Sequence, residues 1–224
     1  EQAEILRHYF LADTALPNLR ASAFFQGLPV AQQQALVDWI ERIRPWSTSD
    51  RTETQQRTIE LMNSGVGIVT YTGHSNHYFY ATLYQLPDGF FNLNDVPRLN
   101  NRQSPFILLT MTCYTSQFPK PDPRPTTLDE RLFLHQNGGA IAVFGPAGLS
   151  VATGHDKLQE GFYRALWSAP PQSAKMGALL EAGYWVVAAS TANLDVNKTY
   201  LLLGDPLTSA RVSENQSSTL NTVC

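Results

Sequence analysis

The 224-residue chain has only two cysteines, no basic run and no long apolar stretch. Cys113 and Cys224 are too few to form a disulfide framework. The net charge is −3 and lysine and arginine do not cluster, so we expect no nucleic-acid partner. No apolar segment approaches the ~20 residues of a membrane-spanning helix, so we predict no such segment.

The remaining composition is that of a globular protein. Hydrophobic residues make up 43% of the chain and charged residues 16%, which is not typical of a disordered segment. We find no internal repeat and no interdomain linker, so we predict a single domain over residues 1–224. Because the chain starts at Glu1 with neither methionine nor signal peptide, we expect it to be a fragment of a longer protein.

Helical spacing of apolar residues dominates the first part of the chain and recurs later. It predicts helices over residues 1–11, 29–45, 52–62, 126–138, 155–167 and 175–189, with a short crossover helix over 93–99. Residues 1–61 are therefore expected to be mainly helical. Residues 184–187 also fit a strand, and the polar tail, residues 213–224, is predicted to be loose.

Short apolar, β-branched runs lie between the predicted helices. They predict strands over residues 66–72, 106–112, 140–144 and 200–203. Continuous apolar runs, unlike alternating ones, are typical of strands that are covered on both faces. The alternation of such strands with helices predicts an α/β domain with a mostly parallel sheet.

The first two predicted strands each stop at a reactive side chain, His74 after the first and Cys113 after the second. Parallel strands end along one edge of a sheet, and ligands bind outside their carboxyl ends. Two neighbouring strands would therefore bring an imidazole and a thiol together, which is the minimum for a cysteine nucleophile. A lone cysteine after an apolar strand is more often a small buried hydrophobic residue, so the pairing decides between these readings.

Four short motifs follow one another between residues 62 and 206. They are Tyr71-Thr-Gly-His74, Cys113-Tyr-Thr-Ser-Gln-Phe118, Gly138-Gly-Ala-Ile-Ala-Val143 and Leu203-Gly-Asp-Pro206. In this order they resemble the signatures of the gingipain family of caspase-like cysteine peptidases, and the order is more specific than any one motif. The resemblance implies a three-layer α/β/α caspase-like fold. Because residues 1–61 read as helical, we expect its sheet to lack the first strand.

The resemblance also implies an activity and a place of action. It points to a bacterial cysteine endopeptidase, secreted or at the cell surface, that acts on proteins or peptides. By motif position, Cys113 forms the acyl-enzyme and His74 is the general base and acid. Backbone N–H groups of Cys113 and Ser75 would bind the oxyanion, although the family usually has glycine at the second position. The candidates for the substrate cleft are Gly73, Asn76, Tyr114 and Gly145.

Two alternatives use the same residues differently. A sortase-like transpeptidase would pass the acyl group to an amine instead of water, and an inactive caspase-like module would keep the fold for binding or assembly. We expect no required cofactor; the resemblance allows a structural calcium ion without assigning its ligands. A zinc site at His74 and His77 would need at least a third ligand, and none is suitably spaced. We expect His155 to start a helix and Asp205 to form a turn.

Overall fold

The computed structural model of the protein describes residues 9–10, 15–81, 88–118, 126–170, 174–191 and 194–210. The chain forms two compact units. One is Ile5–Glu60, and the other is Leu61–Cys224 together with Glu1–Glu4. Both reactive side chains of the sequence analysis belong to the second unit.

The first unit is mainly helical, as predicted. Its helices are α1 (Ala15–Ala21), α2 (Ala23–Gln26), α3 (Val30–Ile43) and most of α4 (Arg51–Asn63). The Ser22 hydroxyl caps α2 by accepting a hydrogen bond from the Phe25 N–H at 3.1 Å. After α3 the chain tightens into one 3-10 turn, η1 (Arg44–Trp46), because Pro45 lacks the N–H that an α-helix would need there.

The helix predicted over residues 1–11 is wrong where the structure describes it. Tyr9–Phe10 is strand β1, and it pairs in parallel with β2 (Ser47–Thr48). The partner strand lies far along the chain, so helical spacing within residues 1–11 could not reveal the pairing. The rest of that predicted helix lies outside the described residues.

A four-stranded sheet forms the centre of the second unit. Its strands are β3 (Ile68–Thr72), β6 (Phe106–Met111), β7 (Ala140–Pro146) and β8 (Tyr200–Leu203), and they neighbour one another in that order. β3, β6 and β7 are parallel, whereas β8 runs antiparallel to β7. The prediction of a mostly parallel sheet is confirmed, although nothing in the sequence revealed the direction of β8.

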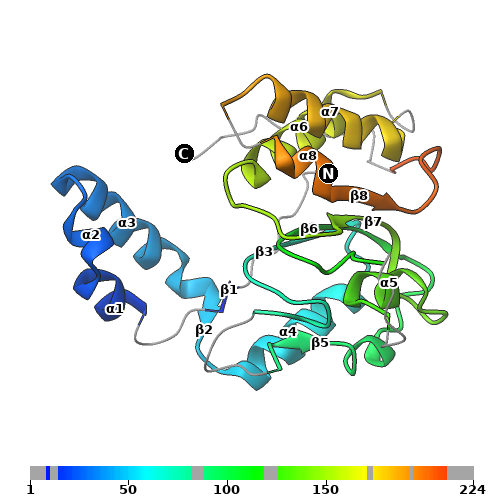
Figure 1. Ribbon diagram of the computed structural model, residues 1–224. Coiled ribbons are helices and arrows are strands. Elements are labelled where there is room, and N and C mark those ends of the chain that lie inside the picture. Colours follow the sequence, from blue (N-terminus) through cyan, green and yellow to red (C-terminus); the bar gives the residue numbers. More distant parts are fainter. Residues whose placement is uncertain are drawn as a thin grey trace. The chain divides into compact units, whose positions relative to one another are not determined.

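Helices cover this sheet on both faces (Figure 1). On one face, Ile107, Leu109 and Met111 of β6 join an apolar core with α6 (His155–Ser168) and α7 (Met176–Ala188). On the other face, α5 (Leu128–Phe133) lies against β7. Burial from both sides explains why β6 is apolar at nearly every position instead of alternating. The strand alternative for residues 184–187 is wrong, because α7 runs through them.

Shorter elements connect these layers. They are β4 (Phe79–Tyr80), β5 (Phe91–Asn92), the 3-10 turn η2 (Val96–Arg98) and α8 (Asp195–Thr199). The crossover helix predicted over residues 93–99 is only the turn η2, since Pro97 removes a backbone donor. The predicted tail, residues 213–224, lies outside the described residues. Within the part of the chain that the structure describes, no helix has the length and apolar character to cross a membrane.

Candidate active site

His74 and Cys113 occupy equivalent positions after neighbouring strands. β3 and β6 pair in parallel with Thr72 opposite Met111, so each reactive residue comes two positions after a paired strand end. The Gly73 N–H still donates to the Met111 carbonyl oxygen at 3.3 Å, which continues the pairing by one residue. Both side chains therefore belong to the carboxyl edge of the sheet, where the strand argument expected them.

The loop at His74 has a fixed backbone and an exposed ring. The His74 carbonyl accepts hydrogen bonds from the Tyr71 hydroxyl at 2.6 Å and from the Ala81 N–H at 2.7 Å. Burial raises the pKa of Tyr71, so its hydroxyl stays protonated and able to donate. A Cβ at position 73 would lie 2.7 Å from the Tyr71 hydroxyl oxygen, so the Tyr71 side chain would have to shift. No described residue forms a hydrogen bond with the imidazole, which leaves both ring nitrogens available.

Cys113 is half-buried, and hydrogen bonds surround it. Its thiol donates to the Ser150 carbonyl oxygen at 3.4 Å. Its backbone N–H donates to the Ser75 hydroxyl at 3.2 Å, and its carbonyl accepts from the same hydroxyl at 2.6 Å. The Thr112 hydroxyl lies 2.5 Å from the Ser75 oxygen as well. Ser75 therefore ties the residues after β3 to the residues after β6.

Serine at position 75 brings no left-handed backbone strain. Among the described non-glycine residues, only Ala81 and Tyr114 have a positive φ. The Ser75 N–H donates to no described residue. Of the two expected oxyanion donors, the N–H of Ser75 is therefore free and the N–H of Cys113 is occupied.

The residue directly after Cys113 has a strained backbone. Tyr114 has φ of 63°, in the left-handed region that residues with a Cβ seldom adopt. Its N–H donates to the Gly148 carbonyl oxygen at 3.0 Å, and its ring lies 5.0 Å from the His77 ring. Such strain is concentrated at functional sites and persists only where surrounding contacts enforce it.

Ser150 and His155 are neighbours of Cys113 that sequence reasoning missed. The Ser150 hydroxyl is 2.8 Å from His155 Nε2, so Ser150 links a second histidine to the Cys113 thiol. Burial lowers the pKa of His155, and its ring lies 5.6 Å from that of Tyr200. The Tyr200 hydroxyl in turn accepts a hydrogen bond from the Thr112 N–H at 3.1 Å. His155 does begin α6 as predicted, but local sequence carries no signal for its link to Cys113.

A buried carboxylate supports the loop after Cys113. Asp129 is fully buried and accepts hydrogen bonds from the hydroxyls of Ser116 at 2.5 Å, Thr110 at 2.9 Å and Tyr80 at 3.3 Å. Burial raises the pKa of Asp129. Gly145, a candidate for the cleft, is instead buried in β7, where its Cβ would lie 2.6 Å from Asp129 Oδ2. The missing side chain at Gly145 makes room for this polar cluster.

Asn76 and His77, both in the loop after His74, also have polar contacts. Asn76 Oδ1 accepts hydrogen bonds from the backbone N–H groups of Tyr78 at 2.8 Å and Phe79 at 3.1 Å, and so closes the turn. His77 Nε2 lies 2.5 Å from Gln117 Oε1. In the described part of the chain, no group of three or more His, Cys, Asp or Glu side chains could hold a metal ion.

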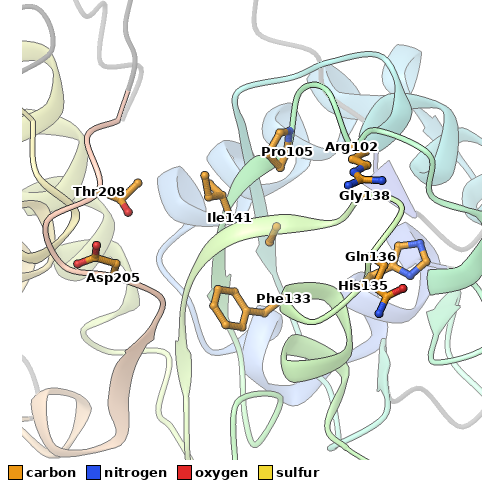
Figure 2. A pocket seen from close by; sticks show the side chains of 10 residues that line it. Arg102, Pro105, Phe133, His135, Gln136, Gly138, Ile141, Asp205 and Thr208 are labelled. Carbon is orange, nitrogen blue, oxygen red and sulfur yellow. The ribbon is translucent and has the colours of Figure 1, made fainter.

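A pocket of about 440 Å³ lies at the opposite edge of the sheet (Figure 2). Pro105 and Ala140, at the amino ends of β6 and β7, line it together with Arg102 and Asp205. Asp205 forms the predicted turn, since Oδ1 accepts a hydrogen bond from the Leu207 N–H at 2.8 Å. The pocket is separate from His74 and Cys113, which follow the carboxyl ends of their strands.

Comparison with known proteins identifies the family. A sequence model of peptidase family C25 matches residues 13–211, nearly the whole chain. The chain belongs to peptidase family C25. This is the family of the gingipains, so the resemblance of the four motifs is confirmed. A comparison with curated protein sequences gives no match.

Solved gingipain structures share the fold of this C25 member. A complex of Porphyromonas gingivalis RgpB pro- and mature domains is 17% identical with a TM-score of 0.59, covering 70% of this chain and 37% of that chain. The Arg specific cysteine proteinase gingipain R (RgpB) is 19% identical with a TM-score of 0.55, covering 70% and 36%. A structure described as a protease is 16% identical with a TM-score of 0.57, covering 74% and 39%. The caspase-like α/β fold is thereby confirmed, and the chain spans less than two fifths of the length of these relatives.

Proposed function

We propose that the protein is a cysteine endopeptidase in which Cys113 is the nucleophile and His74 is the general base and acid. The observation that carries this proposal is the register of β3 and β6, with Thr72 opposite Met111. Because of this register, His74 and Cys113 each lie two residues after the last paired residue of neighbouring strands. Membership of a peptidase family supports the same reaction class.

The reaction begins when the Cys113 sulfur attacks the carbonyl carbon of a peptide bond. The thiol proton passes to His74, directly or through one water molecule, and the carbonyl oxygen becomes an oxyanion. Backbone N–H groups of Ser75 and Cys113 would stabilise that oxyanion. His74 then gives its proton to the leaving amine, and a thioester remains on Cys113. Water attacks the thioester, with His74 again accepting a proton, and the acid product leaves as the thiol reforms.

Proteins or peptides are the proposed substrates. Family membership supports this class, because peptidases of the C25 family act on peptide bonds. The resemblance to gingipains supports action outside the cell or at its surface. Exposure of the His74 ring is consistent with a proton acceptor that a bound peptide can reach.

The test compares the two cysteines of the chain. Cys113→Ala should lower the rate of casein cleavage by at least about a thousandfold, because the acyl-enzyme cannot form. Cys224→Ala is the matched control and should retain the wild-type rate. Iodoacetamide should label Cys113 faster in the folded protein than in urea. Undiminished cleavage by Cys113→Ala would overturn the proposal.

An inactive module for binding or assembly is the second candidate. The hydrogen bond from the Cys113 N–H to the Ser75 hydroxyl favours it, because that donor is then unavailable to an oxyanion. This candidate predicts that folding does not accelerate the labelling of Cys113. It also predicts that Cys113→Ala leaves any residual cleavage unchanged.

A further inference from the structure

We propose that the Ser75 hydroxyl occupies the oxyanion site in the resting protein. It must release the Cys113 N–H before a peptide carbonyl can be activated there. This inference rests on the proposed function and adds an internal competitor for substrate at the same site. Its basis is the position of a single oxygen atom, Ser75 Oγ.

The Ser75 oxygen accepts the hydrogen bond that an oxyanion would need. Cys113 N–H donates to it at 3.2 Å, close to the 2.7–3.1 Å range of oxyanion-hole donors. A backbone N–H carries one proton, so it cannot serve the serine hydroxyl and a substrate oxygen equally well. The hydroxyl is thus in the place of the substrate oxygen, at least with respect to this donor.

Other hydrogen bonds hold the hydroxyl in this position. A hydroxyl can donate one hydrogen bond and accept two. Ser75 Oγ donates to the Cys113 carbonyl oxygen at 2.6 Å, and it accepts from the Cys113 N–H. The second acceptor position is available to the Thr112 hydroxyl at 2.5 Å. Thr112 is only 1% exposed, so water cannot easily replace it as a partner.

Displacement of the hydroxyl therefore opposes the binding of a substrate oxygen. The net contribution of one neutral hydrogen bond corresponds to roughly a three- to tenfold change in an equilibrium constant. Alanine or glycine at position 75 would remove the competitor and keep the backbone N–H of that residue. Such a variant should stabilise an oxyanion better than the wild type.

Two reagents separate the thiol from the oxyanion site. Iodoacetamide forms an S–C bond as iodide leaves, so its rate reports on the Cys113 thiol without an oxyanion. N-Acetylglycinal is an aldehyde without a side chain, and its carbonyl carbon forms a bond to the Cys113 sulfur. The thiol proton passes to His74 while the carbonyl oxygen takes the electron pair and becomes an oxyanion. Its affinity is measured as the concentration that halves the iodoacetamide rate.

We expect Ser75→Ala and Ser75→Gly to lower that concentration by roughly three- to tenfold. Each variant's own iodoacetamide rate without aldehyde is measured beside the affinity, so that a change in the Cys113 thiol itself is detected. Ser75→Thr keeps a hydroxyl and should not show this gain in aldehyde affinity. Ser64→Ala is the control for a serine deletion elsewhere, because Ser64 is exposed and bonded only to the Leu61 carbonyl among the described residues.

An unchanged or weaker aldehyde affinity in the folded Ser75→Ala and Ser75→Gly variants would overturn this inference. So would the failure of both variants to fold, since Ser75 would then be a structural link. These results leave the proposed function intact as long as wild-type Cys113 is labelled faster folded than unfolded. If folding brings no acceleration and the aldehyde protects no variant, the proposed function itself fails.

Discussion

The two edges of the four-stranded sheet differ in shape and in chemistry. At the carboxyl ends of β3 and β6, a thiol lies within a network of backbone and hydroxyl hydrogen bonds. At the amino ends of β6 and β7 lies a pocket of about 440 Å³, and the exposed Arg102 and Ile141 are among the residues that line it (Figure 2). The proposed chemistry belongs to the first edge, although the pocket is at the second. Parallel strands present their loops for binding at the carboxyl ends. Strand direction, and not the position of the pocket, is therefore the basis on which we assign the reaction to the first edge.

The largest expected effect in this comparison is the loss of activity on replacement of His74, with a histidine at the other edge as the control. His74→Ala should lower kcat/KM for peptide cleavage by about 10²- to 10⁴-fold, because no group then accepts the thiol proton. His135→Ala is the matched control at the pocket, where His135 Nε2 lies 3.0 Å from the Leu99 carbonyl oxygen. It should retain the rate once protein concentration is corrected for folding. Equal losses in the two variants would contradict the comparison.

A second prediction concerns the carboxylate that supports the loop after Cys113. Asp129→Ala should lower the free energy of unfolding by about 3 kcal/mol, because the buried hydroxyls of Ser116, Thr110 and Tyr80 lose their acceptor. Asp205→Ala, at the other edge, should cost about 1 kcal/mol or less because Asp205 is exposed. Urea unfolding measures both. A larger loss for Asp205→Ala would reverse the expected order.

The same carboxylate has a predicted pH dependence. Burial raises the pKa of Asp129 above its usual value of 3.8, so the folded protein binds this proton more tightly than the unfolded chain. Its contribution to stability is present at low pH and is lost as pH rises from about 3.8 through the folded pKa. Asp129→Asn cannot titrate, so subtraction of its unfolding free energy from that of the wild type isolates the effect. A difference that grows with pH in this range would have the wrong sign.

The histidine behind Ser150 should give the opposite trend. Burial lowers the pKa of His155 below 6.5, so the unfolded chain binds the proton more readily. The wild type should therefore lose stability as pH falls below about 6.5, and His155→Gln should lack this part of the dependence. Unfolding free energies between pH 5 and 8 test it. Parallel curves for the two proteins would show that His155 does not titrate on unfolding.

The smallest effect is expected at the pocket. Arg102→Ala should leave the cleavage rate within about twofold and the free energy of unfolding within about 0.5 kcal/mol, as for most exposed residues. Casein cleavage and urea unfolding measure these quantities. A tenfold loss of cleavage with unchanged stability would mean that substrates also contact this edge, and the separation of the two edges would fail.

The placement of the two reactive residues was predictable from sequence because strand ends determine it. Continuous apolar runs located both strands, but the prediction of burial on both faces is right only for β6. β3 is the edge strand of the sheet, and its residues are partly buried or exposed. The hydrogen bonds around Cys113 were not predictable. Ser75 and Ser150 reach it from 38 and 37 residues away along the chain, and their contacts depend on loop conformations that no periodic pattern encodes.

Another error has a local physical cause. The helix predicted over residues 93–99 failed because Pro97 interrupts it, and the Asp95 side chain binds the Asn92 N–H at 2.9 Å instead.

The contact between Tyr71 and Gly73 has a consequence for how this chain can diverge. An added methyl group at position 73 would collide with the phenolic oxygen, whereas phenylalanine at position 71 would remove that oxygen. Either change would affect the donor that holds the carbonyl of His74: alanine at 73 would push the phenol away, and phenylalanine at 71 would remove its hydroxyl.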